Sequence, residues 1–93
     1  MTTEQLREAA DALKAFGHGE VYRVLATCRV FRTLKNGEPL EITVELRDAW
    51  PAANPQVRYQ CVLRSDDGRV RYGNWCESIK TAIMIAGWPT FED

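Results

Sequence analysis

Apolar and polar residues alternate with a period of two through most of residues 20–72, and this alternation limits the possible folds more than any other feature of the chain. It is typical of strands that bury one face and expose the other, as in an antiparallel sheet. In the first such stretch the apolar face consists of Tyr22, Val24, Ala26, Cys28 and Val30. Strands are therefore expected over Glu20–Leu34, 40–47, Val57–Arg64 and Arg69–Gly73.

The first hairpin is specified by the Asn36-Gly37 pair together with the requirement that facing residues share the same character. A two-residue loop sets apolar Val30 opposite polar Thr43. A three-residue loop over 35–37, with glycine in the left-handed conformation, sets Val30 opposite Ile42 instead. The sequence therefore predicts the three-residue loop.

The same test at residues 65–68 favours an even loop, with a two-residue Asp67-Gly68 turn that sets Leu63 opposite Tyr72. Between the second and third strands the segment 50–55 contains two prolines. Proline has no amide donor and restricts the residue before it, so this segment cannot form a ladder. We expect a loop there that carries Trp50.

Helical patterns flank the strands on both sides. The first places Leu6, Ala9, Ala10, Leu13 and Phe16 on one face, begins with a capping box and ends at Gly17. The box pairs Thr2 with Gln5. The second is expected to start at Asn74 and to run to Ala86. The expected fold is a single α+β domain over residues 1–93, a meander of about four antiparallel strands with both helices packed on one sheet face.

Composition places the chain among small globular proteins and excludes several classes of function. Hydrophobic residues make up 45% and charged residues 27%, and the net charge is −1. Residues 21–72 carry nine basic and six acidic residues, which is less than a non-specific nucleic-acid binder needs. The three cysteines have no CxxC spacing, and the longest apolar stretch has seven residues. We expect a cytoplasmic protein with reduced thiols and no membrane segment.

Catalytic and metal-binding signatures are missing from the sequence. The single histidine, His18, lies between two glycines and has no local motif around it. Cys76 falls in the first turn of the second expected helix, where the helix dipole can lower a thiol pKa, but no partner group accompanies it. Cys28 and Cys61 fit the apolar alternation as core residues. The expectation is a protein that is not an enzyme, with no catalytic residue, no metal and no cofactor.

The outward face of the expected sheet is rich in arginine, which outnumbers lysine by nine to three in the chain. Arginine and aromatic residues are enriched at interface hot spots. A solvated face with ion pairs to Glu41 and Glu45 explains the same pattern without a partner. The candidate partner-binding residues are Arg23, Arg29, Phe31, Arg47, Arg58, Arg64, Arg69 and Arg71.

A second candidate interface follows from the excess of apolar residues near the C-terminus and in the loop with a tryptophan. Its residues are Trp50, Met84, Ile85, Trp88 and Phe91. Either the core or a partner covers them, and a homodimer is one such partner. We therefore expect a small protein-binding module, a regulator or inhibitor that docks on a protein. Phage-encoded antagonists such as anti-CRISPR proteins share this size class, and the analogy goes no further.

The alternative is a nucleic-acid-binding domain whose arginines clamp phosphates while Tyr72, Trp50 or Phe31 stacks on bases. The order of helix, strands and helix is similar to that of the double-stranded RNA-binding domain, with 58–63 as a strand and Asp67-Gly68 as a turn. The second helix of that family opens with a lysine cluster that grips phosphate, whereas residues 74–80 contain one lysine. The similarity covers the element order alone, and no RNA-binding residue is transferred.

Overall fold

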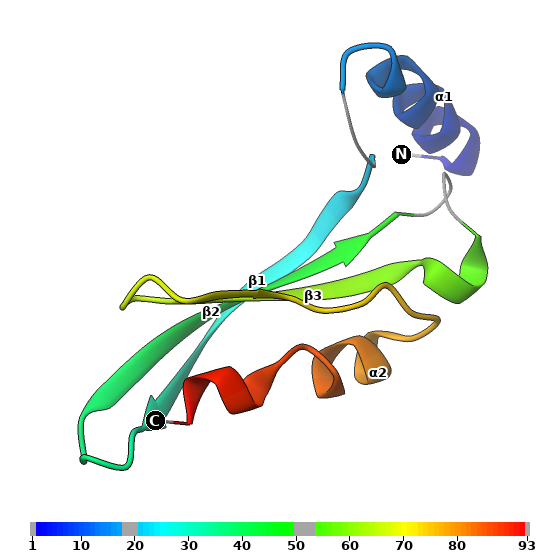
Figure 1. The fold of residues 1–93 in the computed structure, drawn as a ribbon. Coiled ribbons are helices and arrows are strands. Elements are labelled where there is room, and N and C mark those ends of the chain that lie inside the picture. The colour runs from blue at the N-terminus through cyan, green and yellow to red at the C-terminus, as the bar shows by residue number, and fades with distance from the viewer. Residues whose placement is uncertain (1, 18–20, 50–53, 93) are drawn as a thin grey trace.

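The computed structural model describes residues 2–17, 21–49 and 54–92, and Figure 1 shows their arrangement. The elements are α1 (Thr3–Lys14), β1 (Arg23–Thr33), β2 (Pro39–Asp48), the 3-10 turn η1 (Pro55–Val57), β3 (Tyr59–Ser65), β4 (Val70–Tyr72), α2 (Ile79–Met84) and the 3-10 turn η2 (Trp88–Phe91). Within these residues the strands form one antiparallel sheet in the order β1-β2-β3-β4, with each strand beside its neighbour in sequence. The predicted α+β class and the meander are confirmed.

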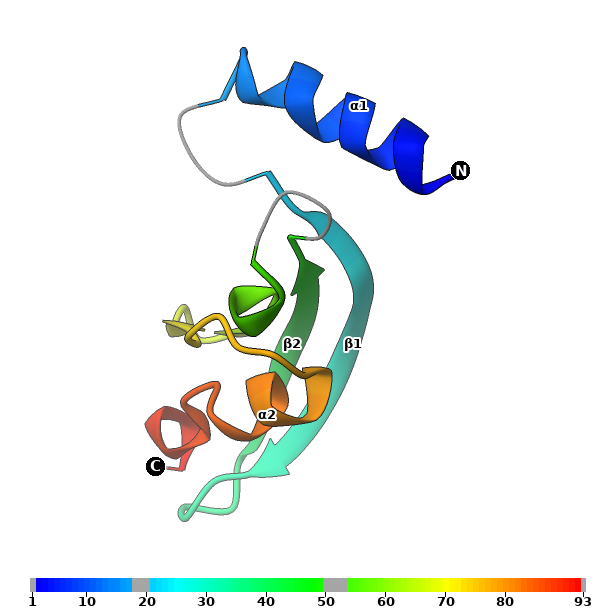
Figure 2. The same ribbon diagram turned by 90° about the vertical axis from the view of Figure 1, so that its right-hand side faces the viewer.

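The N-terminal helix α1 starts as predicted, because the Thr2 hydroxyl accepts from the Gln5 amide at 3.2 Å and the Gln5 side chain accepts from the Thr2 amide at 2.9 Å. Its position differs from the prediction. Figures 1 and 2 show α1 beyond the ends of β1 and β2, instead of on the sheet face with α2. Within Thr3–Lys14, Ala10 is the one buried residue, and most of the apolar stripe of this helix stays exposed.

The register of the first hairpin is the predicted one, with Val30 opposite Ile42 and Gly37 at φ 87° in a three-residue loop. A β-bulge at Leu25 was not predicted. On the N-terminal side of the bulge the register shifts by one residue, so Val24 pairs with Arg47 and Arg23 with Asp48. The bulge therefore exchanges the faces on which the first residues of β1 lie.

The predicted even turn between β3 and β4 is wrong. Leu63 pairs with Arg71 and not with Tyr72, and the loop has three residues, 66–68, with Gly68 at φ 93°. The Ser65 hydroxyl and the Asp67 carboxylate both accept from the Arg69 amide, at 3.1 and 3.3 Å, and these bonds stabilise the longer loop. The shift by one residue moves every side chain of β4 to the face opposite the predicted one.

The C-terminal helix α2 is shorter than predicted, since it begins at Ile79 after the N-cap Ser78, whose hydroxyl accepts from the Thr81 amide at 3.1 Å. The preceding chain is extended, and Cys76 forms a bridge with Tyr59. Figure 1 shows α2 and η2 along one face of the sheet. There they bury the core, which consists of Leu40, Ile42, Val44, Cys61, Leu63, Ala82, Ala86 and Phe91.

Most of strand β1 lies outside this cover. Cys28, predicted to be a core residue from its place in the alternation, is exposed, and Val30 packs on the core but is only half-buried. The α2 helix makes its main contacts with β3, so the cover thins toward β1. Alternation assigned Cys28 to the correct face, but it did not show how far the cover of that face extends.

Candidate functional site

The face of the sheet turned away from α2, which we call the outer face, carries three of the predicted arginines. Because residues paired across neighbouring strands share a face, the register determines its members. They are Val24, Thr27, Arg29 and Phe31 from β1, Glu41, Thr43, Glu45 and Arg47 from β2, Gln60, Val62 and Arg64 from β3, and Val70 and Tyr72 from β4.

Two other predicted arginines, Arg23 and Arg58, pair with a buried carboxylate on the sheet face that carries the core. Asp48 is 1% exposed and accepts from Arg23 Nη2 at 2.9 Å, and from Arg58 Nε and Nη2 at 2.9 and 3.0 Å. The hydrogen bond to Asp48 is also the main reason why the pKa of Arg58 is raised. The prediction that Arg23 and Arg58 lie on the outward face is therefore wrong. The bulge at Leu25 turned Arg23 to the core-bearing face, and Arg58 precedes β3 instead of lying within it.

The last two predicted arginines, Arg69 and Arg71, also lie on the side of α2 and η2. The three-residue loop places the side chains of β4 on the face opposite the predicted one. Arg69 Nη1 donates to the carbonyl of Thr90 at 2.6 Å, and its guanidinium carbon lies 5.4 Å from the centre of the Phe91 ring. Hydrogen bonds from Arg69, and then from Ser65, lower the pKa of Asp67 to about 2. Arg71 lies so close to Gly87 that a β-carbon there would be 2.9 Å from its Nε atom. The predicted outward placement of both arginines is wrong.

The centre of the outer face is Arg47, which is held on several sides. Its guanidinium carbon lies 4.3 Å from the ring centre of Tyr22 and 5.8 Å from that of Tyr72. Its Nε pairs with Glu45, and its Nη1 donates to Gln60 Oε1 at 3.1 Å. Gln60 is itself fixed, because its Nε2 donates to the backbone of Gly73 at 2.9 Å. Arg47 therefore presents a rigid cation between two tyrosine rings, with its side chain 11% exposed.

Exposed groups surround this centre. Tyr72 is 61% and Phe31 is 69% exposed, while Val62 is fully buried on the same face. Arg64 reaches Glu45 at 3.8 Å, and its guanidinium carbon lies 5.8 Å from the Tyr72 ring. Arg29 pairs with Glu41 at 3.2 Å. The outer face thus combines exposed aromatic rings with arginines that already have defined positions.

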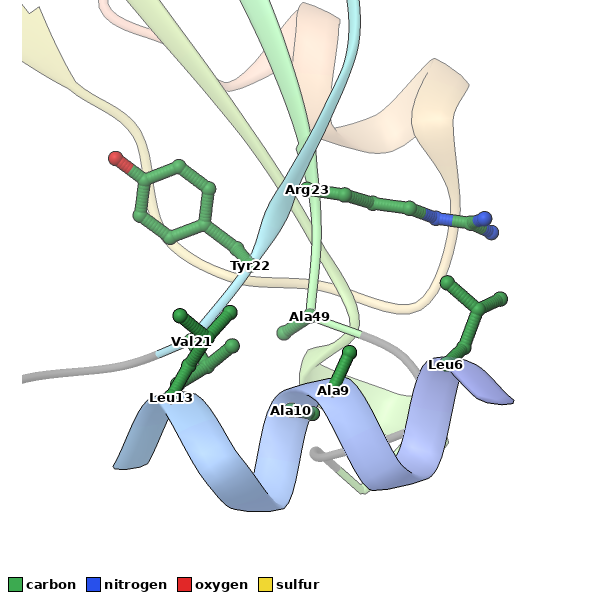
Figure 3. Close-up of a pocket in the computed structure, with 8 residues that line it drawn as sticks. All are labelled: Leu6, Ala9, Ala10, Leu13, Val21, Tyr22, Arg23 and Ala49. Carbon is green, nitrogen blue, oxygen red and sulfur yellow. The ribbon is translucent and has the colours of Figure 1, made fainter. Parts of the chain in front are cut away.

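Sequence analysis missed Tyr22 as a member of this site, and it named Tyr72 only as a base-stacking ring in the nucleic-acid alternative. Tyr22 was assigned to the apolar face of β1, and Tyr72 to the apolar side of β4. Figure 3 shows Tyr22 and Arg23 pointing to opposite sides of β1, and it is Tyr22 that meets Arg47. Trp75, whose ring centre lies 6.2 Å from that of Tyr22, extends the same aromatic group. The one sequence signal for the bulge is the unbroken apolar run of 24–26, which departs from alternation.

The second predicted interface separates into core and surface. Phe91 is fully buried, and Trp88 packs on the core with its Nε1 donating to Ile83 at 2.7 Å, so neither forms an open apolar surface. Of the two covers that the sequence left open, the core is the one that Phe91 takes, because η2 folds it back against the sheet, while Trp88 stays partly exposed. Met84 and Ile85 remain exposed, as predicted. Trp50 lies outside the described residues.

A groove separates α1 from the ends of β1 and β2, as Figure 3 shows. It has a volume of about 90 Å³ and is lined by Leu6, Ala9, Ala10, Leu13, Val21, Tyr22, Arg23 and Ala49. Most of this lining is aliphatic, and the guanidinium of Arg23 already pairs with Asp48. The groove offers apolar contact and has no cluster of groups that would do chemistry.

The three cysteines are free thiols in different surroundings. Cys76 is in an extended segment and not in a helix, so the helix dipole invoked for it does not act there. Burial raises the pKa of the Cys61 thiol to about 11, which keeps it protonated. Residues 2–17, 21–49 and 54–92 contain no group of three or more potential metal ligands. His18 lies outside them.

Comparisons with known proteins add no relative. The chain matches no protein-family model, and neither the curated proteins nor the solved structures contain a match to it. Among the described residues, none of the helices has the length and apolar character to span a membrane.

Proposed function

We propose that this chain is a small non-enzymatic protein-binding module that acts as a regulator or inhibitor by docking on a protein partner. The outer face is the proposed contact surface. The observation that carries the proposal is the Arg47 centre, in which the cation lies between the rings of Tyr22 and Tyr72 and is bonded to Glu45 and Gln60.

A pre-positioned centre of this kind favours binding because it lowers the entropic cost of association. A free arginine side chain loses about 0.5–1.5 kcal/mol when a partner immobilises it. Arg47 has already lost that freedom within its own chain. Arginine and tyrosine are also enriched among the few residues that carry most of the binding energy at interfaces.

The charge of the outer face indicates the chemistry of the partner. Its members include three arginines and two glutamates, Glu41 and Glu45, which leaves an excess of one positive charge, 3 − 2 = 1. Exposed apolar area from Phe31 and Tyr72 accompanies this charge. The complementary surface is mildly acidic and contains apolar or aromatic side chains, which is typical of a protein interface.

Single-stranded nucleic acid is the second candidate, since Tyr72 beside Arg64 is a combination that stacks on a base and binds a phosphate. Two facts weigh against it. Four of the arginines expected on this face lie on the other side of the sheet or at its end, and all three of the others already pair with glutamates at 4.0 Å or less. Binding to a polyanion depends on the number of available cations, which is small here.

The experiment is capture of partners from a host lysate by matched variants, with and without nuclease, followed by identification of the captured species by mass. Arg64→Glu reverses an exposed charge on the outer face, and Arg7→Glu makes the same change on α1 as a control. We expect a nuclease-resistant protein that is lost with Arg64→Glu and retained with Arg7→Glu. Loss of the captured species on nuclease treatment would favour nucleic acid as the partner. Equal capture by both variants would exclude the outer face as the contact surface.

A further inference from the structure

The outer edge of β1 is free in the described part of the chain. β1 is the first strand of the sheet, it has 11 residues, and no other described strand pairs with its outer side. An edge of this length presents a row of backbone donors and acceptors to another strand. Natural edges are usually shorter or covered, and Figure 2 shows β1 along its whole length with neither α1 nor α2 beside its edge.

Backbone alternation identifies the groups at this edge. The Leu34 amide donates to the Glu38 carbonyl at 2.8 Å, so the residues of β1 that bond to β2 are those at even positions from 26 to 34. The amides and carbonyls of Thr27, Arg29 and Phe31 therefore point outward. These groups are available to a further strand.

Charge does not protect the edge as strongly as its arginines suggest. Arg29 is paired with Glu41 at 3.2 Å. The Nη1 of Arg32 donates to the carbonyl of Trp88 at 3.3 Å, and its guanidinium carbon lies 5.9 Å from the Trp88 ring. Both arginines thus make contacts within their own chain, on opposite faces of the sheet.

The sequence of this strand is complementary to itself about its midpoint, Cys28. In an antiparallel pair of two copies centred there, Thr27 faces Arg29 and Ala26 faces Val30, and the match ends at the bulge residue Leu25. Each pair joins residues of like character, apolar with apolar and polar with polar. A two-fold interface requires this kind of self-complementarity.

Neighbouring registers lack this match. Because outward backbone groups must meet outward groups, the centre of the pair moves in whole residues. A centre on Arg29 sets two like charges opposite each other, and a centre on Val30 sets Arg29 opposite Phe31. A centre on Thr27 brings the bulge at Leu25 into the paired segment, opposite Arg29, where it disrupts the ladder.

We propose that the chain forms a homodimer through antiparallel pairing of β1 with β1 of a second copy, centred on Cys28. The two sheets then form one continuous sheet, and both outer faces lie on the same side of it because paired residues share a face. The dimer stands independently of the proposed docking function. It would present two copies of the docking face to a partner that has two sites.

Substitutions at Thr27 distinguish effects on dimer affinity from effects on monomer stability. Within one chain Thr27 faces Glu45, and in the dimer it faces Arg29 of the second copy. Thr27→Lys is expected to raise monomer stability, because it faces Glu45, and to weaken the dimer, because it faces Arg29 of the second copy. Thr27→Glu is expected to lower monomer stability and to strengthen the dimer for the same reasons. With two symmetric contacts, each worth about 0.2–1 kcal/mol, sedimentation equilibrium should give dimer dissociation constants that differ by roughly tenfold between the variants.

Cysteine placement tests the register. At the centre the two Cys28 α-carbons form a pair without hydrogen bonds, about 4.5 Å apart, which lies in the range a disulfide spans. In chains that also carry Cys28→Ser and Cys76→Ser, Ala26→Cys mixed with Val30→Cys should give mainly mixed disulfide dimers under mild oxidation.

Several results overturn the proposal. These are a wild-type chain that stays monomeric at every soluble concentration, Thr27 variants that dimerise equally, and cysteine variants that cross-link with themselves as readily as with each other. A monomeric chain whose β1 amides become protected from exchange only with a captured protein would assign this edge to a foreign strand and would also exclude the homodimer.

Discussion

The ion cluster around Asp48 gives the most quantitative prediction for the fold. Asp48→Asn keeps the shape of the side chain and removes the charge that pairs with Arg23 and Arg58. Removing one partner of a fully buried ion pair costs about 3–5 kcal/mol. Here the guanidinium side chains are 42% and 28% exposed, so water compensates part of the loss. We expect unfolding free energy to fall by about 2–3 kcal/mol, at the lower end or just below that range.

The assay is urea denaturation of Asp48→Asn, Arg58→Gln and the double variant. A fall in the midpoint at constant slope reports stability alone. The coupling energy from the cycle should be about 1–3 kcal/mol, as for residues in one network. The exposed pair of Arg29 and Glu41 is the control and should couple by less than about 1 kcal/mol. Additive effects at Asp48 and Arg58 would refute the structural role assigned to this cluster.

Three further predictions concern the core. Because burial raises the pKa of Cys61 to about 11, a thiol reagent should label Cys28 in the folded protein and Cys61 only after unfolding; early labelling of Cys61 would contradict its burial. Phe91→Ala should cost about 3–5 kcal/mol in thermal unfolding, whereas Met84→Ala should stay within about 0.5 kcal/mol; equal effects would place Phe91 outside the core. Gly73→Ala should lower the melting temperature, since its β-carbon would lie 3.0 Å from the Cys61 carbonyl; an unchanged value would show that the backbone yields.

The first hairpin was predictable because its sequence carries two independent signals that agree. Asn36-Gly37 specifies a turn, and only one loop length places apolar residues such as Val30 and Ile42 opposite each other. The second hairpin had a turn signal too, but its alternation was misleading. Arg71 and Tyr72 both have apolar and polar parts, so either fits the inner side of a short edge strand.

The candidate site was only partly predictable for the same reason. A bulge changes the face of every residue before it, and the bulge at Leu25 brings Arg23 to Asp48, a tertiary contact that local pattern does not encode. The exposed position of α1 is a similar case. An amphipathic stripe shows which side of a helix seeks cover, but not what covers it.

The most direct test of the docking face is the affinity of the captured partner for purified variants. Tyr72 is 61% exposed and contacts Arg47 and Arg64 on the outer face, so its truncation should leave the fold intact. Tyr72→Ala should weaken binding by about 30-fold, the equivalent of about 2 kcal/mol for a hot-spot residue. Met84→Ala, on the opposite side of the molecule, should change it by less than about twofold. Unchanged affinity with Tyr72→Ala, or a larger loss with Met84→Ala, would contradict the account.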